Sequence, residues 1–117
     1  MEKNVYEKLR KQLIELADLI MKDKQPEYTN LNSDVLHNFK TTAENLGLTA
    51  QEVWAVFFYK HVQAILSHAN NPDLNPAEPI SSRYADAINY LFLGYALHYD
   101  KIKNEHEDLS IIYRGIE

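Results

Sequence analysis

Apolar side chains recur every three or four residues along the first part of the chain, which is the period of one helix face. The positions that carry this period are Val5, Leu9, Leu13, Leu16 and Ile20. They predict a helix over residues 4–24 that ends before Pro26, because the residue ahead of a proline disfavours the helical backbone. Residues 25–33, QPEYTNLNS, are rich in turn formers and predict a loop.

Local capping signals mark a short second helix over residues 34–46. Ser33 or Asp34 can accept a backbone hydrogen bond at its start, and Gly47 is suited to the left-handed residue that ends a helix. The segment therefore predicts an independent helical element rather than an extension of the first one.

Two longer helices follow, over residues 50–70 and 81–103. Thr49 and Glu52 form the pattern of a capping box, in which each side chain bonds the backbone amide of the other residue. The tail, residues 104–117, contains LSIIY, which fits either a short strand or a docking arm. The pattern predicts an all-α fold, a compact four-helix assembly with a short C-terminal tail.

Composition places the chain among soluble globular proteins. A chain of 117 residues is long enough for one domain and too short for two, so we expect a single domain over residues 1–117. With no cysteine, thiolate metal sites and disulfides are excluded. A net charge of −5 argues against binding to a nucleic-acid duplex, which normally needs a basic face. No signal sequence or membrane-spanning run is visible, so we expect a cytoplasmic protein.

Four polar residues interrupt the otherwise apolar helix over residues 81–103. Arg83, Asp86 and Tyr90 follow each other at spacings of three and four, so they share one stripe, and Asn89 flanks Asp86. Because a buried charge or amide requires a partner, this stripe must face a polar helix, a ligand or another subunit.

The helix over residues 50–70 offers a matching polar interruption, Lys60 and His61. A Lys60–Asp86 pair would satisfy both charges, and Arg83 could pair with Glu78. Two interpretations stay open: a structural salt bridge between helices, or a pocket in which cationic groups receive an anion.

Metal binding is not expected. Glu15 and Asp18 stand three residues apart, but they share the charged, solvated face of their helix. Hard cations such as Mg²⁺ require several oxygen ligands, and Asp86 and Asn89 supply few. No cofactor is therefore predicted, and Mg²⁺ is considered only under the hypothesis that the protein is an enzyme.

With these residues identified, a resemblance can be stated. Residues 34–100 contain NFKTTAENLGLTAQEVWAVFFYKHVQAI, then EPISSR, then YADAINYLFL. This order resembles small helical proteins of phages and prophages of low-GC Gram-positive bacteria, some of which are labelled nucleotide-modification-associated. The resemblance implies a shared ligand-binding site formed by Lys60, His61, Glu78, Arg83, Asp86, Asn89 and Tyr90.

Three functions follow as hypotheses. The first is a phage-encoded nucleotide-binding protein in an infected or lysogenic host, which sequesters an immune signalling nucleotide without catalysis. The second is an enzyme of nucleotide metabolism, a Mg²⁺-dependent nucleoside phosphate hydrolase or a modification-associated protein. The third is a protein-binding antagonist of a host defence factor. The lack of a metal-binding set or a general base favours the first.

The chain is also expected to form a homodimer or a higher oligomer. The helix over residues 81–103 is apolar around nearly its whole circumference, and Tyr84, Phe92, Tyr95 and Tyr99 are too many for three other helices to cover. Exposed apolar patches of that size usually mark an interface.

Overall fold

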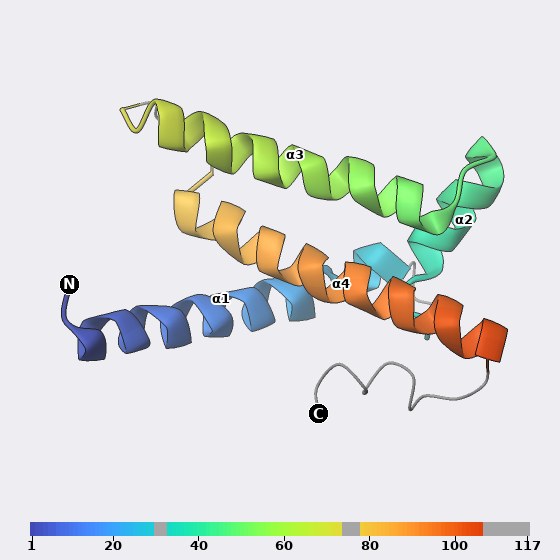
Figure 1. Cartoon of the computed structure of the whole chain (residues 1–117), viewed down its shortest axis with the longest axis horizontal. Helices are drawn as coiled ribbons and strands as arrows, with labels where there is room; N and C mark the ends of the chain where they lie inside the picture. Colours follow the sequence, from blue (N-terminus) through green and yellow to red (C-terminus); the bar gives the residue numbers. More distant parts are fainter. Residues whose placement is uncertain (30–32, 74–77, 107–117) are drawn as a thin grey trace.

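The computed structural model describes residues 1–29, 33–73 and 78–106, which form four helices and no strand. The helices are α1 (Lys3–Thr29), α2 (His37–Leu46), α3 (Ala50–Asn70) and α4 (Ile80–His106), as Figure 1 shows. The predicted all-α assembly of four helices is confirmed.

The two strongest capping signals form as predicted. The Thr49 hydroxyl accepts from the Glu52 amide at 3.1 Å, and the Glu52 carboxylate accepts from the Thr49 amide at 3.0 Å. Gly47 has φ 69° and ends α2, and its N–H points to the last carbonyls of that helix. These short-range contacts determine where α2 ends and where α3 begins.

Three helix ends differ from the prediction. α1 continues through Pro26 to Thr29, although a proline inside a helix removes one backbone hydrogen bond. α2 begins at His37, because Asp34 forms a turn ahead of it: its carboxylate accepts the Leu36 amide at 2.9 Å. α4 extends to His106, so residues 104–106 are helical, while the rest of the predicted tail lies outside the described residues.

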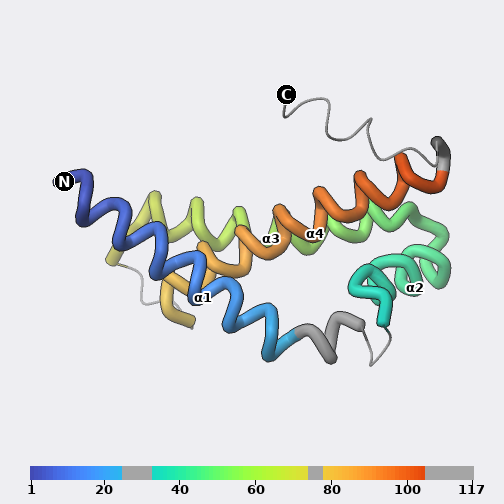
Figure 2. Tube along the Cα trace, turned by 90° about the horizontal axis from the view of Figure 1, so that it is seen from below, coloured from blue at the N-terminus to red at the C-terminus, as the bar shows by residue number. Residues whose placement is uncertain are grey.

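α4 is the central helix of the fold. It lies between α1 and α3 and contacts both, while α2 packs against α3 and touches α1 (Figure 1). Figure 2 shows that α2 and the C-terminal half of α1 lie on the same side of the α3–α4 pair. α4 is therefore the helix whose side chains meet those of the most neighbours.

The apolar core forms where α2, α3 and α4 meet. Its buried members are Leu36, Phe39, Ala43, Val53, Tyr90, Leu93 and Leu97. Two polar residues of α4, Asp86 and Asn89, are buried beside this core. Among the described residues, no helix is both long enough and apolar enough to cross a lipid bilayer.

Candidate functional site

Asn89 connects α4 to α1. Its side-chain amide donates to the Ala17 carbonyl at 2.8 Å, and the bond is buried. Buried amides normally have such a partner, and a bond of this kind contributes about 1 kcal/mol. The sequence places Asn89 in the candidate ligand site, but in the structure its amide faces α1 and helps to hold the two helices together.

Asp86 lies between α1 and α3. Its Oδ1 is 3.7 Å from Lys24 Nζ of α1, and its Oδ2 is 3.9 Å from His61 Nδ1 of α3. Both distances exceed those of a hydrogen bond, although the carboxylate is only 4% exposed. Asp86 Oδ1 and His61 Nδ1 are buried and have no hydrogen-bond partner among the described residues. A carboxylate so placed loses its water and gains little in return.

Burial keeps His61 neutral near pH 7. Desolvation lowers the pKa of this imidazole from its ordinary value of 6.5, and the positive charges of Arg83 and Lys24 lower it further. Asp86 and Glu78 act in the opposite direction and raise it. A neutral histidine cannot balance the negative charge of Asp86. The positive charge that pairs with Asp86 near pH 7 is therefore that of Lys24, whose side chain is 41% exposed.

Arg83 and Glu78 form the pair that the sequence predicts, but loosely. Arg83 Nε lies 3.9 Å from Glu78 Oε2, and the Glu78 side chain is 53% exposed. Exposed pairs at this distance contribute little to stability, about 0–1 kcal/mol. The Arg83 guanidinium is thus available to a stronger anionic partner.

Lys60 does not form the predicted pair with Asp86. Its side chain is exposed, and its ammonium lies 5.7 Å from the centre of the Phe57 ring. Successive residues of a helix point about 100° apart, so Lys60 and its neighbour His61 cannot face the same helix. Lys24, which lies far away in the sequence on α1, takes the predicted place of Lys60.

Tyr90 links the charged groups to an aromatic cleft. Its ring lies 4.7 Å from the His61 ring, centre to centre, and meets the edge of Phe39 at 6.2 Å. The cleft has a volume of about 260 Å³ and is lined by Asn38, Phe39, Thr42, Phe57 and Tyr90.

Residue spacing contains a partial signal for this cleft. Phe57 precedes His61 by four residues and so shares its stripe on α3, and Asn38 and Thr42 are spaced in the same way on α2. That spacing places each pair on one face, but only the packing of α2 against α3 brings the two faces together.

The register of α3 against α4 is fixed by Trp54. Its indole N–H donates to the Tyr90 carbonyl at 2.6 Å, and its ring lies against the backbone of Gly94. A Cβ at position 94 would overlap the indole, so this approach requires glycine. The contact sets His61 opposite Tyr90 and Asp86.

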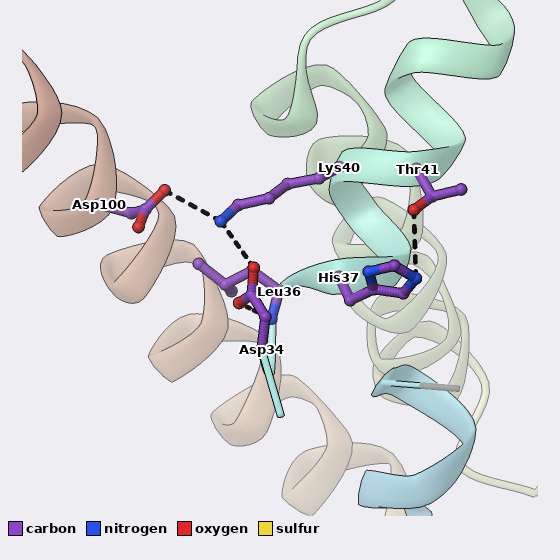
Figure 3. Close-up of polar contacts among 6 residues, drawn as sticks. All are labelled: Asp34, Leu36, His37, Lys40, Thr41 and Asp100. Carbon is purple, nitrogen blue, oxygen red and sulfur yellow. Dashed lines mark hydrogen bonds and ion pairs between the residues drawn. The ribbon is translucent and has the colours of Figure 1, made fainter. Parts of the chain in front are cut away.

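A second charged cluster holds α2 in place. Lys40 Nζ lies 2.8 Å from Asp34 Oδ2 and 3.3 Å from Asp100 Oδ2 of α4, as Figure 3 shows. The hydrogen bond to Asp34 raises the pKa of Lys40, and the same bond lowers the pKa of the Asp34 carboxyl. Because Asn38, Phe39 and Thr42 of α2 line the aromatic cleft, this cluster helps to position the α2 wall of the cleft although it does not line the cleft itself.

The described residues hold no group of three or more histidine, aspartate or glutamate side chains placed to bind a metal ion. Glu15 and Asp18 are both exposed on α1.

Comparisons with known proteins add no relative. No family model matches the chain, and neither the curated proteins nor the solved structures contain a match. The candidate site therefore rests on its own geometry. Asp86 lies beside Lys24 and His61, and Arg83 is close enough to lower the pKa of His61. The Tyr90 ring contacts both the His61 ring and Phe39 of the aromatic cleft.

Proposed function

We propose that the chain is a nucleotide-binding protein that captures a nucleoside phosphate and leaves it unchanged. The observation that supports this most concerns two neighbouring buried atoms. Neither Asp86 Oδ1 nor His61 Nδ1 has a hydrogen-bond partner among the described residues. Proteins rarely keep such groups without a use for them. A ligand that donates to the carboxylate would supply the missing bonds.

Ribose hydroxyls fit the carboxylate. An ionised aspartate only accepts hydrogen bonds, so its partner must carry donors, and the hydroxyls of a sugar are such donors. Acidic side chains bind ribose in this way in dinucleotide-binding proteins. Neutral His61, with one donor and one acceptor nitrogen, can take part from the side of α3.

The aromatic cleft suits a nucleobase. Phe39, Phe57 and Tyr90 supply ring faces and edges, and a base stacked on such rings gains about 1–3 kcal/mol. At about 260 Å³ the cleft lies just under the usual range for whole ligands, about 300–1,000 Å³, so it fits a part of a nucleotide. Asn38 and Thr42 place polar groups at its wall, where the edge of a base would lie.

Arg83 and Lys24 are the groups for a phosphate. Both side chains are partly exposed, at 28% and 41%, and the ion pairs that they form with described residues are each longer than 3.5 Å. A guanidinium binds phosphate through two parallel hydrogen bonds, which are stronger than its loose pair with Glu78. Phosphate, sugar and base would thus lie in order along α4, from Arg83 to Tyr90.

The resemblance to phage proteins suggests the biological setting. In an infected bacterium, a small protein that binds tightly without turnover could withhold an immune signalling nucleotide from its receptor. Capture needs only donors, a carboxylate and a ring, whereas metal-assisted hydrolysis would also need carboxylates beside Asp86. Hydrolysis is the alternative that the experiment must separate.

The test is to incubate the purified protein with a mixture of nucleoside phosphates and cyclic nucleotides, with and without Mg²⁺. After gel filtration, the bound fraction is denatured by heat and its small molecules are identified by mass. We expect an intact nucleotide in the bound fraction of the wild-type protein. Its amount should fall at least tenfold in Asp86→Asn and in Arg83→Gln.

Glu15→Gln is the matched control, because it removes a carboxylate from the exposed face of α1, outside the candidate site. It should bind as wild type does. New products in the supernatant would support the enzyme instead, and equal retention by all variants would place the ligand elsewhere. No retained species at micromolar protein would overturn the proposal and favour a protein partner.

A further inference from the structure

Within residues 1–29, 33–73 and 78–106, the side of the α3–α4 pair that faces away from α2 is apolar and uncovered. On α4, the residues that contact α1, α2 and α3 leave a fourth face, which carries Tyr84, Leu91 and Tyr95, exposed at 44%, 54% and 54%. These positions follow the spacing of one helical stripe, with half-buried Ile88 between them.

α3 extends this surface. Its residues toward α2 include Val53 and Phe57, and those toward α4 include Trp54 and His61. At 100° per residue, Tyr59 and Leu66 lie on the side that faces neither helix, and they are exposed at 62% and 56%. We call Tyr59, Leu66, Tyr84, Leu91 and Tyr95 the outer face.

We propose that a second copy of this chain covers the outer face, so that two α3–α4 pairs pack against each other about a twofold axis. Helical domains bury their apolar stripes between two packed layers, and among the four described helices the second layer lies on the α2 side. In such a dimer, the α3–α4 pair of each chain forms the second layer for the other chain.

The area agrees with a dimer. The three tyrosines of the outer face expose together about 320 Å², taking about 200 Å² for a whole aromatic side chain. That alone reaches the size of the largest patch on a typical monomer, about 300–600 Å². The two leucines and the rim raise it toward the roughly 800 Å² that each partner contributes to a standard interface.

The chemistry favours a copy over a different partner. A twofold interface requires a patch that is complementary to itself, and an apolar patch meets this condition. The α4 stripe continues through Tyr99 to Ile102, about 27 Å from Tyr84, without a charged residue on it. Complementary charges would help to select a different protein as partner, and this stripe offers none.

The proposal is tested by sedimentation of the full chain at micromolar concentration. We expect twice the chain mass of 13.6 kDa. Replacing Leu91 and Tyr95 together by lysine should raise the dissociation constant at least about 100-fold, because like charges would meet in the contact. The matched control is Leu46→Lys, which places a lysine at a residue 66% exposed on α2, and it should sediment as wild type does.

Two outcomes would overturn the proposal: a wild-type monomer, or a dimer that the double lysine variant retains. If removal of residues 107–117 turns a monomer into a dimer, the tail covers the outer face instead of a second copy. Should the lysine variant lose its helical circular dichroism, Leu91→Cys replaces it, since the chain has no other cysteine. A short bismaleimide should then join two chains through position 91, and should not join them through Leu46→Cys.

Discussion

Replacing Asp86 by asparagine separates a ligand-binding carboxylate from a structural one. A structural ion pair that loses one partner leaves the other charge buried, and this costs about 3–5 kcal/mol. In the structure the partner of Asp86 is Lys24, which is 41% exposed and can turn to water once the carboxylate is gone. The usual penalty for a stranded charge is therefore not expected.

The expected change in stability follows from three contributions. The lost attraction to a half-exposed lysine at 3.7 Å contributes about 0–1 kcal/mol. Removing the charge of a buried carboxylate relieves a desolvation penalty of several kcal/mol. The buried amide that replaces it has unsatisfied groups of its own, which cost about 1–3 kcal/mol. We expect Asp86→Asn to be about as stable as wild type or about 1 kcal/mol more stable, while nucleotide binding is lost.

Urea unfolding, extrapolated linearly to water, measures this difference. Protein concentration is kept fixed, since association shifts apparent stability. Asp34→Asn is the comparison, because Asp34 accepts at 2.8 Å from Lys40 and at 2.9 Å from the Leu36 amide, and should lose about 1–2 kcal/mol. A loss of 3 kcal/mol or more in Asp86→Asn would refute the reasoning and make Asp86 a structural residue.

Three further predictions concern the same region. Gly94→Ala should lower stability by about 1–3 kcal/mol in thermal unfolding, because the new methyl group overlaps the Trp54 indole; an unchanged midpoint would contradict the packing. The folded pKa of His61 lies below its ordinary value of 6.5, so the unfolded chain binds this proton more readily and stability falls as the pH drops below 6.5. Wild type should lose more stability than His61→Gln between pH 7 and pH 5, and equal losses would contradict the shift. In an NMR titration, Asp86→Asn should lower the pKa of His61 and Lys24→Gln should raise it, and shifts of the same sign would contradict the placement of these charges.

The helices were predictable where the determining contacts are local. The Thr49–Glu52 capping box and Gly47 lie within four residues of the contacts that they make, so the sequence alone shows them. A proline is a less reliable signal for a helix end, because it disfavours the helical backbone of the residue before it without excluding it. Pro26 predicts the end of α1, yet the helix continues to Thr29.

The site was predictable only as a set of polar interruptions. His61, Asp86 and Tyr90 do meet, because two apolar helices place their few polar residues at matching levels. The cation for Asp86 was assigned to Lys60, the nearest lysine on a core helix, whereas Lys24 of α1 takes that place. Sequence spacing relates residues of one helix to each other, and it contains no information on which distant helix crosses them.

The all-round apolar character of α4 now has an explanation that joins the site and the proposed interface. One side of α4 meets α1 through Asn89, another meets α3 through Asp86 and Tyr90, and a third reaches α2 through the Asp100–Lys40 ion pair. The fourth side, with Tyr84, is equally apolar and has no cover within the described residues. Sequences usually keep local chemistry and fold in agreement, and departures from that agreement collect at functional sites. Within the described residues α4 departs from it twice, through an unsatisfied buried carboxylate and through an uncovered apolar face. We propose a different partner for each departure: a nucleotide for the first and a second chain for the other.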